Sequence, residues 1–317
     1  MLPDRTSEFR LIESFRDAIG SAPQVLTGIG DDTAVVRSPV GDVLLAADML
    51  LEGVHFDLET ATPFQVGRKV LAVNLSDVAA MAGQPKYALI SLALPRQLSK
   101  MHDERFASQL FEGLHSLAKE FDTVIVGGDT NAWDGPVVIN VAIVGEVSAG
   151  EAITRSGAKP GDWVFVTGSL GGSITGHHLD FTPRVNEALA LRDACQLTSM
   201  IDVSDGLIAD LYHILEESGV GAILNADSIP ISDATSSATD DRTPLEHALG
   251  DGEDFELLFT VPPEDGQRLA SSNPLVISLS HIGEIVDGDS CRLREESGTE
   301  TETTLPRLGW SHNVGQS

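Results

Sequence analysis

The sequence contains little cysteine and few basic residues. Cys195 and Cys291 are the two cysteines among 317 residues, and they do not form a pair with metal-ligand spacing. Neither a disulfide framework nor a structural zinc site is therefore expected. There are 48 Asp and Glu against 20 Lys and Arg, a formal net charge of −28 at pH 7. This acidic excess repels nucleic-acid phosphates and anionic membrane surfaces, and no basic patch in the sequence offsets it.

Long apolar segments are also missing. The longest runs, such as residues 87–94, are far shorter than the ~20 residues that a membrane helix needs. The N-terminus carries charges at Asp4, Arg5 and Glu8 and has no apolar core, which argues against a signal peptide. We therefore expect no nucleic-acid partner, no membrane span and a cytoplasmic location.

The composition is that of a folded globular protein. Hydrophobic residues make up 42% of the chain, and 30 Gly and 15 Pro are spread along it. At about 150 residues per domain, the length suggests two domains. Residues 148–161 are rich in Gly and Pro and indicate a boundary loop. We place the domains at 1–148 and 149–317.

The order of predicted elements indicates the fold class. The first half has predicted helices at 6–19, 63–83 and 100–120, and strands at 33–37, 43–48, 87–94, 123–126 and 137–147. This order predicts an α+β domain with a mixed sheet. The second half has predicted strands at 163–167, 200–203, 255–261 and 279–286, a helix at 206–218, a Gly-rich segment at 168–176 and a loop at 228–241. It is predicted to be an α/β domain.

One acid falls where the pattern calls for an apolar residue. In the helix that begins at Pro63, Asp77 lies on the same stripe as Val66, Val70 and Val73. A buried carboxylate must be paired, hydrogen-bonded or bound to a metal. The sequence leaves two interpretations open: a metal ligand, or an ion pair with Lys69 or Arg68.

Three further acids follow or interrupt apolar strands. Asp48 ends the run 43–47, Asp129 ends the run 124–128, and Asp202 interrupts a run around 200–203. Carboxylates at the ends of strands from different segments can converge on one cation, so we expect one shared edge. Each of these acids taken alone is more commonly a turn or helix-cap residue.

Two more pairs of polar residues favour a hard divalent cation. Asp31 and Asp32 are adjacent on a Gly turn, and Ser204 and Asp205 precede a predicted helix. Adjacent like charges raise each other's pKa unless a cation neutralises them. Oxygen ligands without cysteine select Mg²⁺, Mn²⁺ or Ca²⁺, and Mg²⁺ typically binds carboxylates together with substrate phosphates.

Backbone N–H groups could meet phosphate at three turns. These are Gly127-Gly128, the run 168–176, and the helix start at 204–206. None matches the P-loop pattern, which excludes a P-loop NTPase. Arg155 is one of few cations near these turns and could contact a phosphate, although an ordinary surface arginine is the simpler interpretation.

Other polar residues are framed by apolar neighbours. His55 and Glu253 could each orient a substrate or be structural groups. His177 and His178 are adjacent and point apart on a helix or strand, so they do not predict a metal site. No Gly-x-Ser-x-Gly elbow supports a serine hydrolase.

The acidic and glycine-rich segments together resemble one enzyme family, thiamine-monophosphate kinase. The segments are GIGDDTAVV at 28–36, ADMLLEGVHF at 47–56, AVNLSDVAAMAG at 72–83, GGDT at 127–130, TRSGAKPGDWVFVTG at 154–168, IDVSDGLIADL at 201–211 and GDGEDFELLFT at 250–260. Single pieces are shared with aminoimidazole ribonucleotide synthetase and its relatives, but the full set in this order is specific. The resemblance covers nearly the whole chain.

The resemblance implies a fold and an activity. The fold is aminoimidazole ribonucleotide synthetase-like, with a dimerising N-terminal α+β domain that binds Mg²⁺ and ATP and a C-terminal α/β domain that completes the nucleotide and substrate site. The activity is transfer of the ATP γ-phosphoryl group to thiamine phosphate with several Mg²⁺ ions, the last step of thiamine diphosphate synthesis, by a homodimer.

The resemblance also assigns residues. Mg²⁺ ligands would be Asp32, Asp48, Asp77, Asp129, Asp202 and Asp205, with Asp31 close by. Gly127, Gly128, Arg155 and Ser204 would contact ATP, and His55, Glu253 and Trp310 would face thiamine phosphate. No residue acts as a general acid or base, because the acceptor phosphate is already ionised at neutral pH.

Two departures from the family pattern stand out. Ala46-Ala47 replace hydroxyl residues before Asp48, and Asp251 adds a negative charge in the segment 250–254. Two alternatives remain: a sister ATP-dependent synthetase of the selenophosphate or aminoimidazole ribonucleotide type, and a non-catalytic cation- or nucleotide-binding protein. Selenophosphate synthetases carry a reactive Cys or selenocysteine near the N-terminus, and no Cys precedes Cys195 here.

Overall fold

The computed structural model describes residues 14–20, 22–29, 33–37, 40–96, 103–295, 302–306 and 309. The described residues divide into two compact units. Unit 1 runs to Glu151 without 79–82, and unit 2 runs from Ala152 together with 79–82. The predicted helix 6–19 is described only from residue 14, and 14–19 are helical. No described helix is long and apolar enough to span a membrane.

Unit 1 is built on a mixed sheet. Its elements are β1 (Val25–Thr27), β2 (Val35–Val36), β3 (Asp42–Leu51), α2 (Pro63–Ala80), β4 (Gln84–Pro95), α4 (Asp103–Glu120), β5 (Val124–Trp133) and β6 (Val138–Val147). In the described residues, β3 to β6 form a four-stranded sheet in the order β3-β6-β4-β5, and β1 pairs with β2. Strands β4 and β5 are parallel, and the other pairs of the larger sheet are antiparallel.

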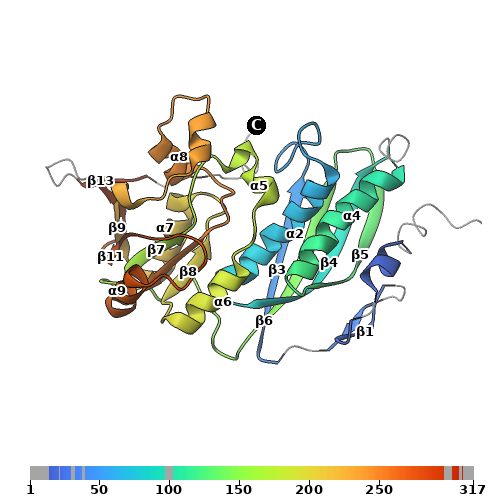
Figure 1. The fold of residues 1–317 in the computed structure, drawn as a ribbon, viewed down its shortest axis with the longest axis horizontal. Helices are drawn as coiled ribbons and strands as arrows, with labels where there is room; N and C mark the ends of the chain where they lie inside the picture. Colours follow the sequence, from blue (N-terminus) through green and yellow to red (C-terminus); the bar gives the residue numbers. More distant parts are fainter. Residues whose placement is uncertain are drawn as a thin grey trace, which may run out of the picture. The chain divides into compact units, whose positions relative to one another are not determined.

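Helices α2 and α4 lie side by side over one face of this sheet (Figure 1). Alternate residues of the strands are buried beneath them, among them Leu44 and Leu50 of β3 and Val141 of β6. The helices approach closely because of two glycines, Gly67 of α2 and Gly113 of α4. A Cβ on Gly67 would lie 1.9 Å from the carbonyl oxygen of Leu110, and glycine is the one residue without that atom.

The N-terminus of α2 is where the sequence predicts it. Thr62 Oγ1 accepts the N–H of Gln65 at 3.2 Å, and Gln65 Oε1 accepts the N–H of Thr62 at 3.1 Å. This reciprocal pair is a capping box, with Pro63 at the first helical position. The helix ends at Ala80, three residues before the predicted end, and Ala82 takes a left-handed φ of 54°.

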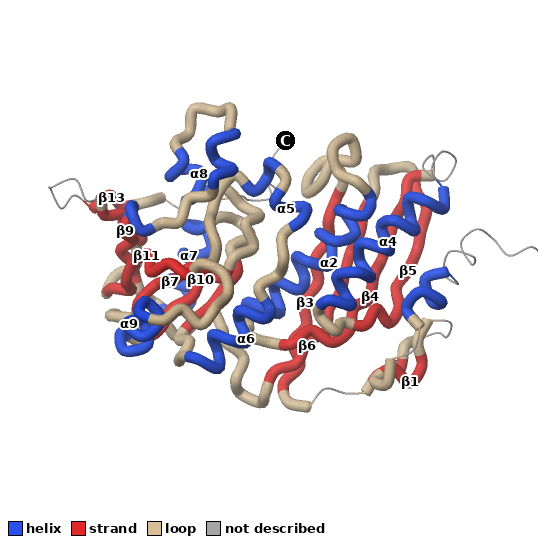
Figure 2. Tube along the Cα trace, viewed as in Figure 1, coloured by secondary structure: helices blue, strands red, loops and turns tan. Residues whose placement is uncertain are grey.

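Unit 2 is built on a second, mainly antiparallel sheet. Its strands are β7 (Trp163–Thr167), β8 (Ser199–Asp202), β9 (Gly221–Asn225), β10 (Leu257–Val261), β11 (Leu279–Val286), β12 (Cys291–Arg294) and β13 (Glu302–Thr304). In the described residues they run in the order β13-β12-β9-β11-β7-β10-β8, and β9 and β12 are parallel. Figure 2 shows these strands with the helices of the unit around them.

Unit 2 also has helical segments, which include the helix predicted at 206–218. They are η1 (Ser173–Thr175), α5 (His177–Asp180), α6 (Val185–Ala194), α7 (Leu207–Ser218), η2 (Ala226–Ser228), η3 (Asp233–Ser237), α8 (Pro244–Gly250) and α9 (Pro263–Ser271). The apolar side of α7, with Leu207, Leu211 and Ile214, packs into a core with Val164 and Leu258 of the sheet. Strands β7 and β11 have the predicted bounds, whereas β9, β12 and β13 were not predicted.

Candidate functional site

Two acids of unit 1 lie in direct contact. The carboxyl groups of Asp48 on β3 and Asp77 on α2 are hydrogen-bonded to each other. Burial raises the pKa of the Asp48 carboxyl, against smaller lowering effects from Asp77 and the nearby His55. Two carboxyls in contact need either a shared proton or a cation between them. This pair therefore suits a divalent cation.

Neighbouring amides hold Asp48 in place. Asn74 of α2 accepts the N–H of Asp48 at 3.2 Å, and Asn140 of β6 donates to the Asp48 carbonyl at 3.0 Å. Of the two cations considered as partners of Asp77, Arg68 lies 3.4 Å from Glu120. Lys69 donates to the carbonyl of His55 at 2.5 Å.

Asp48 and Asp129 do not end their strands, so the expectation of one shared strand edge was wrong for both. Strand β3 continues to Leu51 and β5 continues to Trp133, because both segments keep pairing with their neighbours. Only Asp202 lies at a strand end, that of β8. Both acids lie inside their strands because the residues that follow them, Met49 to Leu51 in β3 and Thr130 to Trp133 in β5, continue the backbone pairing.

The register separates Asp48 from Asp129. Asp48 pairs with Val141, Val141 with Ile90, and Ile90 with Gly128, so this row crosses all four strands. Three interstrand steps of about 4.8 Å place the backbone of Asp48 about 14 Å from Gly128 and its neighbour Asp129. Within one sheet these two carboxylates cannot ligate the same ion. Asp129 is exposed and accepts from Asn131 at 2.6 Å.

His55 is presented by a tight turn after β3. Its Nδ1 accepts the N–H of Leu51 at 3.1 Å, which places the ring proton on Nε2. Lys69, only 1% exposed, donates to the His55 carbonyl from α2 and anchors the turn. The arrangement makes His55 a hydrogen-bond donor through Nε2, a suitable partner for an anionic substrate.

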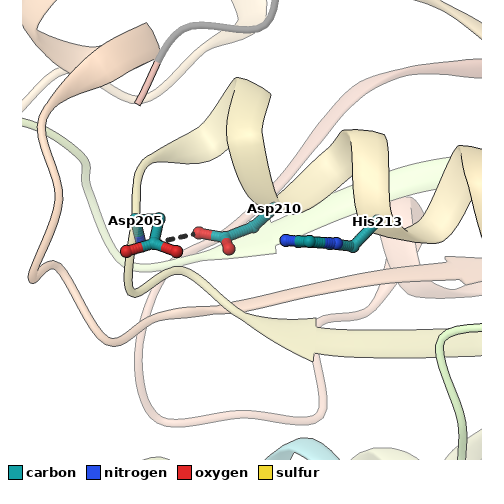
Figure 3. Close-up of side chains that lie close together, drawn as sticks. All are labelled: Asp205, Asp210 and His213. Atoms are coloured by element: carbon teal, nitrogen blue, oxygen red, sulfur yellow. Dashed lines mark hydrogen bonds between the residues drawn. The ribbon is translucent and has the colours of Figure 1, made fainter. Parts of the chain in front are cut away.

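The acidic turn of unit 2 is organised by a residue that the sequence reasoning missed. Asp210 of α7 is 1% exposed, and its Oδ2 accepts three successive backbone N–H groups, those of Ser204, Asp205 and Gly206, at 3.0, 3.0 and 3.1 Å. Figure 3 shows Asp210 between Asp205 and His213. Ligand atoms of these three side chains lie within 4.8 Å of one another. Among the described residues this is a group that could hold a metal ion.

Electrostatics in this group favour a cation. Burial, together with the negative charges of Asp202 and Asp205, raises the pKa of Asp210 to about 8, against the lowering effect of the backbone N–H groups. Asp202 is itself buried at the end of β8. Acids gathered in a buried group are stabilised by a bound divalent ion. The carboxylates of Asp205 and Asp210 are oxygen ligands of the kind that Mg²⁺ prefers, and His213 adds an imidazole nitrogen to the group.

The same contacts correct the prediction that two of the turns offer N–H groups to phosphate. The N–H groups of 204–206 are taken by Asp210. In the Gly-rich segment, Gly171 donates to Asp254 at 2.8 Å and Gly172 to Asp251 at 2.9 Å. Carboxylates of the protein therefore already occupy these donors. Ser204 can contact ATP through its side chain, but its N–H is engaged.

The segment around Glu253 lies next to the Ser204 turn. The N–H of Glu253 donates to the Ser204 carbonyl at 2.7 Å, and that of Phe255 to the Val203 carbonyl at 2.8 Å. A Cβ on Gly252 would lie 2.7 Å from the Ser204 oxygen, so this approach needs glycine. The structure thus brings one predicted ATP residue and one predicted substrate residue together in unit 2.

Asp251, the acid that departs from the family pattern, is neutralised locally. It lies 2.7 Å from Arg242 and 2.9 Å from His247, in addition to its bond from Gly172. Asp254 in the same segment is buried, and burial raises its pKa to about 8. The extra negative charge of Asp251 is therefore stabilised by its contacts with Arg242, His247 and the N–H of Gly172.

The remaining predicted residues are less informative. Gly127 and Gly128 lie within β5, where Gly128 packs against the backbone of Ile90. Arg155 is exposed, and its carbonyl accepts from Ser218 at 3.2 Å. Asp31, Asp32 and Trp310 lie outside the described residues.

A signal for Asp210 was present in the sequence. It lies among the apolar residues Leu207, Ile208 and Leu211 of α7, all of which are buried with it. This is the same pattern that identified Asp77, an acid where the apolar face of a helix requires a hydrophobic residue. Lys69 carried a comparable signal between Val66 and Val70, but its contact with the His55 turn depends on the tertiary fold.

Family models and relatives match most of the chain. The model for the N-terminal domain of AIR synthase related protein matches residues 30–147, and that for the C-terminal domain matches residues 159–296. The chain is 40% identical over 275 residues to thiamine-monophosphate kinase of Rhodopirellula baltica, covering 83% of this chain and 84% of that protein.

Solved structures give the same result. The chain is similar to thiamine-monophosphate kinase from Stenotrophomonas maltophilia, with a TM-score of 0.79, 34% identity and coverage of 93% of this chain and 98% of that one. It is also similar to AaThiL complexed with AMPPCP and TMP, with a TM-score of 0.72, 31% identity and coverage of 98% and 100%. The two-domain architecture predicted from the sequence is confirmed.

Proposed function

Because the chain belongs to the thiamine-monophosphate kinase family, we propose that its carboxylates hold Mg²⁺ ions while thiamine phosphate attacks ATP directly in line. The chain is a thiamine-phosphate kinase, which phosphorylates thiamine monophosphate. The observation that carries the metal proposal is the contact between the Asp48 and Asp77 carboxyls. Such a contact suits a cation, and ATP is a substrate that concentrates negative charge beside it.

The ions would be held by acids of both units. The proposed ligands of unit 1 are Asp32, Asp48, Asp77 and Asp129, with Asp31 close by. The proposed ligands of unit 2 are Asp202 and Asp205. Bound Mg²⁺ supplies charge neutralisation for the phosphate oxygens. Unit 1 would bind Mg²⁺ and ATP and form the dimer, and unit 2 would complete the nucleotide and substrate site.

The protein's own residues position the reactants. His55 donates from Nε2 toward the acceptor phosphate, and Glu253 faces the thiamine moiety with Trp310. Gly127, Gly128, Arg155 and the Ser204 hydroxyl contact ATP. An ionised oxygen of thiamine phosphate forms a bond to the γ-phosphorus as the bond to the bridging oxygen of ADP breaks. Positioning and charge stabilisation account for most of the rate in such reactions.

The two alternatives raised by the sequence have weaker support. A sister synthetase would use another acceptor, and a binding protein would not consume ATP. Relatives that are 40% identical over most of the chain carry the kinase name. The kinase proposal is therefore the one we retain.

The assay measures ADP and thiamine diphosphate from purified protein with ATP and Mg²⁺, with and without thiamine phosphate. Equal amounts of both products, abolished by a chelator and restored by Mg²⁺, are expected. ADP without thiamine diphosphate would contradict the acceptor, and full activity in chelator would contradict the metal role.

We also propose that a second copy of the chain covers the open face of the unit 1 sheet. Residues of β3 that face away from the helices are apolar and exposed, with Leu45 76% and Met49 54% exposed. Leu89 of β4 lies on the same face and is also exposed. An apolar surface of this kind on a folded unit marks an interaction site.

Contact between the edges of the two sheets, in addition to their open faces, would explain the separation of Asp48 and Asp129 in this dimer. The two acids lie on β3 and β5, the two edge strands of the described sheet. If the β3 edge of one copy meets the β5 edge of the other, Asp48 comes beside the partner's Asp129. One site would then draw ligands from two chains.

The substitution Leu45→Glu tests the dimer. A buried unpaired carboxylate at the interface is strongly unfavourable, so light scattering is expected to show a monomer and kcat to fall by about 10²-fold or more. The matched control is Val276→Glu, which makes the same change at a fully exposed position of unit 2. A Leu45→Glu dimer with normal turnover would contradict the proposal.

A further inference from the structure

The segment that carries Glu253 is held in an unfavourable backbone conformation. Glu253 and Phe255 have φ angles of 66° and 50°, in the left-handed region that residues other than glycine rarely adopt. Such conformations persist where surrounding contacts hold them, and they gather at functional sites. The contacts that hold this segment therefore identify residues that matter for its role.

Two buried side chains hold Glu253 itself. His178 Nδ1 lies 3.0 Å from Glu253 Oε2, and Ser173 Oγ donates to the Glu253 carbonyl at 2.6 Å. His178 is 6% exposed and Ser173 is 1% exposed. One contact fixes the carboxylate and the other fixes the backbone. Both come from the stretch of chain that begins with the Gly-rich run 168–176.

The adjoining contacts follow the same pattern. The N–H groups of Gly171 and Gly172 donate to Asp254 and Asp251, on either side of Glu253. Phe255 stacks on Phe181 with ring centroids 4.2 Å apart. The stretch 171–181 thus contacts the acidic segment 251–255 through hydrogen bonds and a ring stack and holds it in place. This stretch donates hydrogen bonds to carboxylates of the acidic segment, so the N–H groups of Gly171 and Gly172 are bonded to Asp254 and Asp251.

We propose that His178 is a positioning residue for thiamine phosphate and acts through Glu253. The proposal rests on the substrate role of Glu253 proposed above. An N–H at Nδ1 donates to Oε2 and fixes the rotamer of a side chain that otherwise has three rotatable bonds. The carboxylate is then oriented before substrate arrives, so less side-chain freedom is lost on binding. A carboxylate held in this way suits the amino group or the cationic ring of thiamine.

The test compares two substitutions of His178 in the full-length protein. His178→Leu removes the hydrogen-bond donor and fills the position with an apolar side chain. His178→Asn instead places an amide N–H near the position of ring Nδ1. We expect His178→Leu to raise KM for thiamine phosphate by about tenfold or more, and KM for ATP to stay within about twofold. His178→Asn is expected to recover most of this loss. His177→Asn is the matched control at the neighbouring exposed histidine and should resemble the wild type.

A double-mutant cycle separates this proposal from the role of Glu253. If Glu253→Gln raises KM for thiamine phosphate and His178→Leu adds little to it, His178 acts through Glu253. A normal KM in His178→Leu, or an equal rise for both substrates without recovery in His178→Asn, overturns the proposal. If Glu253→Gln leaves KM for thiamine phosphate unchanged, the substrate role of Glu253 fails, and the role of His178 fails with it.

Discussion

Asp77→Asn is expected to lower kcat by about 10²- to 10³-fold while leaving the metal-free protein at least as stable as the wild type. Asp77 and Asp48 are hydrogen-bonded acids in a partly buried place. An asparagine amide can donate to Asp48 without a shared proton, so the contact survives and one negative charge disappears. The substitution therefore removes a carboxylate charge that would help to bind the divalent cation.

Two readouts make this prediction specific. Thermal unfolding in chelator should show an unchanged or higher Tm for Asp77→Asn, and the Mg²⁺ concentration for half-maximal activity should rise. Asp122→Asn is the matched control, because Asp122 is exposed at the end of α4 and asparagine accepts its left-handed φ of 49°. A variant with normal turnover, or one that is unfolded at 25 °C, would contradict the assignment of Asp77.

A mixed dimer of Asp48→Asn and Asp129→Asn chains is expected to recover about half of the wild-type activity, although each variant alone is nearly inactive. The register holds the two acids about 14 Å apart within one sheet. If each site takes Asp48 from one chain and Asp129 from the other, the mixed dimer contains one site with both acids intact. Two different affinity tags and sequential purification isolate this species.

The control for the mixed dimer pairs Asp48→Asn with Asp77→Asn. These two acids are in contact within one unit, so both sites of that dimer are damaged and activity stays low. Recovery in the first mixture and none in the second is the expected pattern. No recovery in either mixture would show that Asp48 and Asp129 serve sites formed by a single chain.

Local patterns predicted the elements that carry the site. The capping residues Thr62 and Pro63 fixed the start of α2, and helical periodicity then placed Asp77 on its inward side. The strand bounds of β7 and β11 follow from their apolar composition and turn residues. These features depend on residues within a few positions of one another, so a single sequence is sufficient to find them.

Features that depend on tertiary contacts could not be predicted in this way. Asp48 and Asp129 looked like strand ends because each interrupts an apolar run, but pairing with β6 and β4 extends both strands beyond the acids. The Gly-rich run 168–176 was one of three turns that could offer N–H groups to phosphate, yet the N–H groups of Gly171 and Gly172 donate to acids about 80 residues away in the sequence. Asp210 shares its signal with Asp77, but the three N–H groups that it accepts are visible only in the folded turn.

In the proposed mechanism the protein contributes positioning and charge stabilisation and forms no covalent bond to the phosphoryl group. Burial raises the pKa of both thiols, Cys195 and Cys291, to about 12, so neither is a ready nucleophile. A single direct transfer inverts the configuration at phosphorus, whereas two successive transfers through a phosphorylated residue retain it.

The most direct measurement is therefore the configuration of the transferred phosphoryl group, with ATP made chiral at the γ-phosphorus by oxygen isotopes and thiamine phosphate as acceptor. Direct in-line transfer requires inversion in the thiamine diphosphate product. Retention would contradict it, because retention requires a nucleophile on the protein that forms and then loses a bond to phosphorus.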